Sequence, residues 1–184
     1  MRLRVLGVGN LLQGDDGIGV RLAQELSRRT WPEGVEIWEV GMAGGPHLVG
    51  LWEAAEAVLI LDAAQFGSLP GTLRRWDFLS PKEAVRAVST LPEGACLDPH
   101  RSSVLPALLL AAALGIDIPV HLIGIQPASV QPGSRLSPEM ERAWPRLVRE
   151  VEQMIAQVLE RGQDCQGPEA GNKTERKHGQ GSDH

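Results

Sequence analysis

Two aspartates and one histidine stand where their side chains could do chemistry. Asp16 lies in a glycine-rich loop between the first apolar run and the first helical pattern, Asp62 ends a later β-favouring run, and His100 precedes another helical pattern. Two carboxylates and an imidazole form an oxygen and nitrogen ligand set. Such a set suits borderline divalent ions such as nickel or zinc and leaves positions open for a further ligand. The same groups could also serve general acid/base hydrolysis.

The elements that must position these residues alternate between strands and helices. Short β-favouring runs, flanked by Gly, Pro or Asp, cover residues 3–7, 35–40, 57–61 and 120–125. Helical patterns lie between them, one with apolar residues at Ile18, Leu22 and Leu26 and one over 104–114. This alternation predicts an α/β protein with a three-layer α/β/α fold. Its mostly parallel sheet of about five strands would be covered by helices on both faces.

Two further elements complete the predicted fold. The last helix should open at the capping residue Ser137 and end at Gly162. Pro145 lies inside this pattern and lacks a backbone donor, which predicts a kink or a restart of the helix there. A weaker fifth strand over 71–76 contains two adjacent arginines, so an edge or half-exposed position is expected.

The three candidate residues should emerge at one rim of the sheet. In an open parallel sheet, ligands collect at the carboxyl ends of the strands. Asp62 ends a strand, and Asp16 is one loop beyond another strand. His100 follows Pro99, which keeps its loop extended just before a helix, so the loop can deliver the imidazole to the same rim. The sequence alone does not prove that the three meet.

A dinucleotide site is the competing interpretation of the glycine-rich loop, residues 7–17. That fingerprint requires a third glycine where Leu12 stands. Two acids also occupy the start of the helix, where a pyrophosphate would need open N–H groups. Glu39 could mimic the acid that binds a ribose, so the nucleotide alternative stays open, but the paired acids favour a cation.

Composition narrows the partners and the compartment. The formal net charge of −5 provides no basic footprint for nucleic acid or an anionic membrane, so a protein or a small molecule is the expected partner. The two cysteines, Cys96 and Cys165, form no disulfide framework, which favours the cytoplasm. Residues 1–162 are expected to form a single, monomeric domain, and the polar tail 163–184 is expected to be disordered.

Four separated segments stand in a fixed order along the chain: the loop GVGNLLQGDDGIGV, the strand VLILDA, the loop LDPH, and GIQP followed by LSP. Together they resemble the hydrogenase maturation endopeptidases, and the resemblance covers roughly residues 3 to 160. The resemblance implies a twisted sheet flanked by helices. It also implies an endopeptidase that removes the C-terminal extension of the precursor of a NiFe-hydrogenase large subunit after nickel insertion.

The same resemblance assigns the site. It implies that Asp16, Asp62 and His100 are the catalytic and nickel-contacting residues, and that the nickel is presented by the substrate rather than held permanently. The family often has glutamate at the position of Asp16, so the pocket could be wider. Met42 stands in a loop where the family commonly has a Gly-Thr-Ala-Gly run, so specificity could differ. A nickel-sensing or chaperone-like protein without cleavage is the main alternative.

Other polar residues near these motifs have simpler interpretations. Asp15 is expected to cap the first helix. His121 lies inside a predicted strand and should be a hydrogen-bonded core imidazole. His47 begins a predicted helix near the rim and is a minor candidate. Cys96 precedes His100 by four residues, but Pro99 resists the helical geometry that a cysteine–histidine pair would need.

Overall fold

A computed structural model of the chain describes residues 1–42, 45–88 and 104–164. Its elements follow in the order β1 (Leu3–Val8), the short 3-10 helix η1 (Gly14–Gly17), α1 (Ile18–Leu26), β2 (Val35–Gly41), α2 (Gly45–Gly50), β3 (Ala57–Ala63), β4 (Leu73–Phe78), α3 (Pro81–Val88), α4 (Val104–Ala113), β5 (Val120–Ile125) and α5 (Pro138–Asp164). Strands and helices alternate along most of the chain, which confirms the predicted α/β class.

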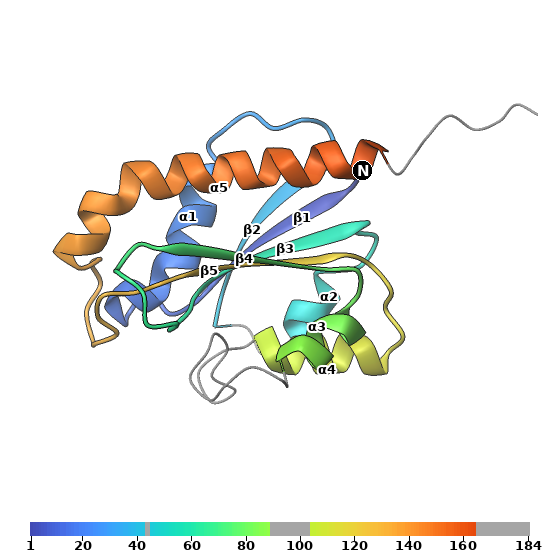
Figure 1. The fold of residues 1–184 in the computed structure, drawn as a ribbon, viewed down its shortest axis with the longest axis horizontal. Helices are drawn as coiled ribbons and strands as arrows, with labels where there is room; N and C mark the ends of the chain where they lie inside the picture. The colour runs from blue at the N-terminus through green and yellow to red at the C-terminus, as the bar shows by residue number, and fades with distance from the viewer. Residues whose placement is uncertain (43–44, 89–103, 165–184) are drawn as a thin grey trace, which may run out of the picture.

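The sheet has the strand order β2-β1-β3-β5-β4. All neighbouring strands are parallel except β4, which runs antiparallel to β5. Helices α1 and α5 cover one face, and α2, α3 and α4 cover the other (Figure 1). The three layers and the mostly parallel sheet are as predicted, and the predicted fifth strand is confirmed as the edge strand β4.

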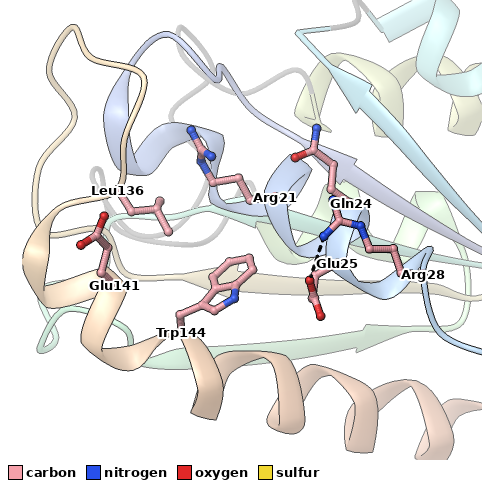
Figure 2. A pocket seen from close by; sticks show the side chains of 7 residues that line it. All are labelled: Arg21, Gln24, Glu25, Arg28, Leu136, Glu141 and Trp144. Carbon is pink, nitrogen blue, oxygen red and sulfur yellow. Dashed lines mark hydrogen bonds and ion pairs between the residues drawn. The ribbon is translucent and has the colours of Figure 1, made fainter.

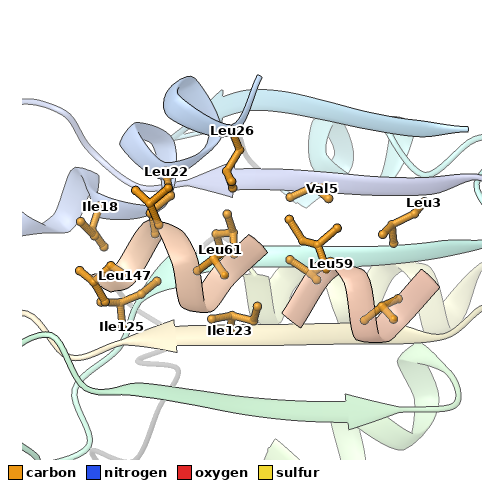
Figure 3. Packing of buried hydrophobic residues seen from close by; sticks show 14 of the residues in the cluster. Leu3, Val5, Ile18, Leu22, Leu26, Leu59, Leu61, Ile123, Ile125 and Leu147 are labelled. Carbon is orange, nitrogen blue, oxygen red and sulfur yellow. The ribbon is translucent and has the colours of Figure 1, made fainter. Parts of the chain in front are cut away.

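Apolar side chains on both faces of the sheet hold the layers together. On the α5 side, alternate residues of β1, β3 and β5 pack against the apolar stripes of α1 and α5 (Figure 3). On the other side, the intervening residues of the same strands pack under α2, α3 and α4. The first six residues of β3 are buried on both faces, as expected for a central strand of a parallel sheet.

The last helix departs from its prediction. Helix α5 runs from Pro138 to Asp164 without interruption, so the predicted restart at Pro145 and the stop at Gly162 are both wrong. Pro145 removes only one backbone donor, while the buried residues that follow it, such as Leu147, keep the helix on the sheet. Gly162 packs against Met1, whose side chain occupies the place of a Cβ.

Several predictions fall on residues that the structure does not describe. They concern His100, the two cysteines and the tail from residue 165 onward. Among the helices of the described ranges, none combines the length and the apolar character that crossing a membrane requires.

Candidate active site

The loop after β1 folds back and carries Asp16 to the carboxyl rim. Asp16 lies in η1, immediately before α1, and is half-buried. Its Oδ2 accepts a hydrogen bond of 3.0 Å from the backbone N–H of Asn10. The Asn10 side chain in turn accepts a bond of 2.9 Å from the N–H of Leu12. A hydrogen bond from Asn10 therefore holds the Asp16 carboxylate against the beginning of the loop that follows β1.

Glycines in this region allow close packing of the backbone. Gly9 has φ of +129°, and a Cβ at this position would overlap the carbonyl oxygen of Asp16. Gly7 and Gly19 lie against each other where α1 crosses β1, again with no room for a Cβ. These glycines therefore bring η1 and α1 onto the sheet, a role that requires no nucleotide phosphate.

Asp62 lies inside β3, one residue before the strand ends, and it is 9% exposed. It pairs in register with Gly124 of β5. Together with Val104, the first residue of α4, it lines a small pocket on the α4 side of the sheet. The sequence predicted Asp62 at the strand end, and the structure confirms this position to within one residue.

The sheet topology brings the two acidic segments to neighbouring strands. Strand β1 lies between β2, to which α1 leads, and β3. Strands are therefore added on one side of β1 first and on its other side afterwards, so the strand order switches between the parallel neighbours β1 and β3. In open α/β sheets, this switch point is where a crevice for ligands forms, at the carboxyl ends of the strands. The helix that carries Asp16, η1, contacts β3, which carries Asp62. His100 lies outside the described residues, and the described residues by themselves form no group of three His, Cys, Asp or Glu suited to a metal.

Asp15 does not have the role predicted for it. Neither η1 nor α1 has a side-chain hydrogen bond at its N-cap, so the prediction of a helix cap is wrong. Asp15 is fully buried and instead accepts bonds from the backbone N–H groups of Ala128, Ser129 and Ser137, and from the Ser137 hydroxyl. Its partners lie more than a hundred residues away in the sequence, beyond the reach of local helix-capping rules. Ser137 also accepts a bond from the N–H of Met140, so its predicted capping of α5 is confirmed.

His121 is a hydrogen-bonded imidazole, as predicted. Its Nδ1 lies 2.7 Å from Oδ1 of Asp77 on β4. Burial lowers the pKa of His121 below its usual range, although the neighbouring Asp77 carboxylate acts in the opposite direction. Burial tends to raise the pKa of Asp77, but hydrogen bonds from Arg75 and His121, with their positive charges, lower it overall. The His121–Asp77 pair lies near the amino end of β5, away from the carboxyl rim. The minor candidate His47 is exposed on α2.

A separate pocket of about 310 Å³ opens between α1 and α5. Figure 2 shows its lining: Arg21, Gln24, Glu25 and Arg28 from α1, Leu136 from the connection between β5 and α5, and Glu141 and Trp144 from α5. Neither Asp16 nor Asp62 lines it, and its charges are mixed. It is therefore not part of the acidic site.

Comparisons with known proteins identify the family of the chain. The family model described as hydrogenase maturation protease matches residues 20–154, a range that contains Asp62 and His100 and begins after Asp16. The hydrogenase 2 maturation protease of Escherichia coli is 32% identical over 88% of this chain and 93% of its own length. The hydrogenase expression/formation protein HupD of Thiocapsa roseopersicina is 33% identical over 80% of this chain, which spans 65% of that relative's length.

A solved structure of a similar protein has the same fold. The hydrogenase maturating endopeptidase HybD of Escherichia coli superposes with a TM-score of 0.68 at 32% identity, over 88% of this chain and 94% of that one. The fold is that of an α/β protein in which two aspartates, Asp16 and Asp62, lie near the topological switch point of the sheet. The chain belongs to the hydrogenase maturation protease family, whose characterised structures are those of endopeptidases and therefore of hydrolases.

Proposed function

We propose that this chain is an endopeptidase that removes the C-terminal extension from the precursor of a NiFe-hydrogenase large subunit after nickel has been inserted. The observation that carries the proposal is the placement of Asp16, in η1 after β1, and of Asp62, near the end of β3, at the carboxyl ends of two neighbouring parallel strands, where the switch point of the sheet lies. Family membership supports the substrate class, since the matching relatives are named for hydrogenase maturation.

Nickel belongs to the substrate in this proposal. Asp16, Asp62 and His100 would contact the ion that the precursor presents, and the remaining coordination positions would be filled by the precursor. His100 precedes Val104 by four residues, a separation that extended chain spans in at most about 14 Å. Val104 lines the same small pocket as Asp62, which supports a rim position for the histidine.

Catalysis would rest on orientation and on activation of water. Holding the nickel of the precursor at two carboxylates fixes the peptide chain beside it, so the scissile bond is presented in one geometry. Water is then activated by the ion or by a carboxylate acting as general base. No serine or cysteine nucleophile is required by this scheme.

We further infer a monomer in the cytoplasm with no membrane or nucleic-acid partner. The negative net charge and the paucity of cysteines support these inferences.

The direct test is to incubate the purified chain with nickel-loaded and nickel-free precursor. Mass spectrometry should detect a released C-terminal peptide and a shortened large subunit only with the nickel-loaded form. Stable binding with the precursor left at full length would instead favour a nickel-sensing or chaperone-like protein. Cleavage of both forms at equal rates would show that nickel is not what the site recognises.

A further inference from the structure

The connection between β5 and α5, residues 126–137, touches both acidic segments of the site. It has little regular structure, apart from a bridge between Gln13 and Gly133. Nevertheless its first residue, Gln126, is 5% exposed, and its last, Ser137, bonds to a fully buried carboxylate. We call residues 126–137 the clasp.

Residues near both ends of the clasp donate hydrogen bonds to the Asp15 side chain. Its Oδ2 accepts bonds of 3.0 Å from the N–H groups of Ala128 and Ser129 and of 2.8 Å from the Ser137 hydroxyl. Its Oδ1 accepts a bond of 2.7 Å from the Ser137 N–H. A buried carboxylate with this many donors makes strong, charge-assisted bonds, so its position is closely defined. Asp16 is the next residue in the chain and shares that constraint.

Backbone hydrogen bonds also join the clasp to residues 12–15, the loop after β1 and the start of η1. The N–H of Gly14 donates to the carbonyl of Gly133 at 2.7 Å, and the N–H of Gly133 donates to the carbonyl of Leu12 at 2.9 Å. The N–H of Asp15 donates to the carbonyl of Ser129 at 3.3 Å. The clasp therefore holds η1 by its main chain as well as by the Asp15 side chain.

Gln126, the first residue of the clasp, holds the segment that follows Asp62. Its Oε1 accepts bonds from the N–H groups of Phe66 and Ser68, at 2.8 and 3.3 Å. Its Nε2 donates to Oε1 of Gln65 at 2.9 Å and to the carbonyl of Pro127 at 3.1 Å. Every polar atom of the buried amide is thus used, as a buried amide requires.

We propose that the clasp sets the relative position of the two acidic segments, with Asp15 as a positioning residue for Asp16 and Gln126 as one for the segment after Asp62. Asp15 is fully buried, so it acts through Asp16 rather than on the substrate. The hydrogen bonds to Asp15 and those made by Gln126 all come from one short connection, so this connection links η1 to the segment that follows β3. The consequence for cleavage rests on the proposed function, whereas the structural coupling does not.

The Asn10 amide gives a readout of Asp16 that does not depend on cleavage, because its N–H donates to the Asp16 carboxylate. In Asp15→Asn, one carboxylate oxygen becomes an amide donor that faces other donors. We expect its Asn10 amide to exchange with solvent about tenfold faster or more, as measured by NMR. Val151 in α5 serves as an internal reference, and its amide exchange should stay unchanged in the folded variant. Gln131→Ala, an exposed position in the clasp, is the matched control and should leave both amides unchanged.

Processing of nickel-loaded precursor supplies the second readout. Asp15→Asn should lower kcat by roughly 10- to 100-fold with KM changed less than about twofold, because supporting residues orient ligands without forming the docking surface. Ser137→Ala removes the hydroxyl that donates to Asp15 and also the cap that accepts the Met140 N–H, but it leaves the other Asp15 bonds in place. It should show a smaller effect in the same direction, and its Asn10 exchange decides the matter if Asp15→Asn does not fold. A folded variant with wild-type exchange at Asn10 overturns the proposal, whatever its activity. If the wild-type chain cleaves no precursor, the proposed function fails, while the exchange result still decides the role of the clasp.

Discussion

Gly19 of α1 lies directly against the carbonyl oxygen of Leu61, the residue before Asp62, so that a Cβ at position 19 would overlap that oxygen. The same Cβ would also approach the carbonyl of Val8 at the end of β1. A single glycine thus fixes how closely α1 approaches both strands of the switch point, and the distance between the two acidic segments depends on it.

Gly19→Ala should therefore destabilise the fold by about 1–3 kcal/mol, the usual cost of overpacking against backbone that cannot move. Urea unfolding measures this. Gly50→Ala is the matched control, because a Cβ at Gly50 in α2 meets nothing within 4 Å. It should be neutral or slightly stabilising through its helix propensity. Equal stability of the two variants would mean that α1 can shift away from the sheet.

Asp62→Asn should lower the rate of precursor cleavage by at least about 100-fold, because the amide loses the charge that a metal ligand or general base requires. Its urea midpoint should stay close to that of the wild type, since the shape of the side chain is kept. The rate is measured with nickel-loaded precursor under single-turnover conditions.

Asp117→Asn provides the control for that experiment, because it makes the same chemical change at an exposed position just before β5, at the opposite edge of the sheet. It should cleave at the wild-type rate. An Asp62→Asn variant as active as Asp117→Asn would remove Asp62 from the site.

The free energy of unfolding should decrease as pH falls through the range in which His121 is protonated in the unfolded chain but not in the folded one. The folded state holds the pKa of His121 below 6.5, so between that value and the folded pKa the unfolded chain binds more protons. Stability is therefore fully present above about pH 6.5 and declines as pH falls. Asp77 and Arg75 from β4 and Arg161 from α5 face this imidazole.

Thermal unfolding of the wild type and of His121→Gln between about pH 7 and 5 tests this dependence. The variant should lose part of the slope of Tm against pH, whereas His47→Gln, at an exposed position, should keep it. Identical slopes in all three proteins would assign the acid sensitivity to other groups.

Pro145→Ala should stabilise the chain. The exposed proline sits inside the continuous helix α5 and leaves the carbonyl of Glu141 without its helical donor, at a cost of up to about 3 kcal/mol relative to alanine. Gln153→Ala, another exposed position on α5, should change the unfolding free energy by less than about 0.5 kcal/mol. A destabilised Pro145→Ala would show that the proline ring makes packing contacts that alanine cannot replace.

The strands were predictable because their residues carry the signal locally. The run Val120–Ile125 was predicted with its observed bounds, and Asp62 was placed within one residue of the end of β3. Helix α3 was missed because Pro81–Val88 has only eight residues and too few apolar positions to show a helical repeat, whereas in the fold it packs on α4. The end of α5 was misjudged because only the fold shows that Met1 fills the space beside Gly162.

At the site, the features that depend on local sequence pattern could be predicted, whereas those that depend on contacts between distant residues could not. Asp16 and Asp62 could be predicted at one rim because the carboxyl ends of parallel strands share an edge. The role of Asp15 could not be predicted, since helix-capping rules describe neighbours in sequence and its partners, Ala128, Ser129 and Ser137, lie more than a hundred residues away. Whether His100 joins the two acids stays a prediction.

The bond between Asp15 and Ser137 closes a loop of 122 residues. Closing such a long loop costs conformational entropy, and the contact forms only after most of the chain is available. During synthesis on the ribosome, a nascent chain that ends before residue 128 therefore has η1 without these anchoring bonds, and one that ends before residue 137 still lacks the two bonds from Ser137. The acidic rim acquires its final geometry only when the amino end of α5 docks, which makes assembly of the site one of the last events in folding.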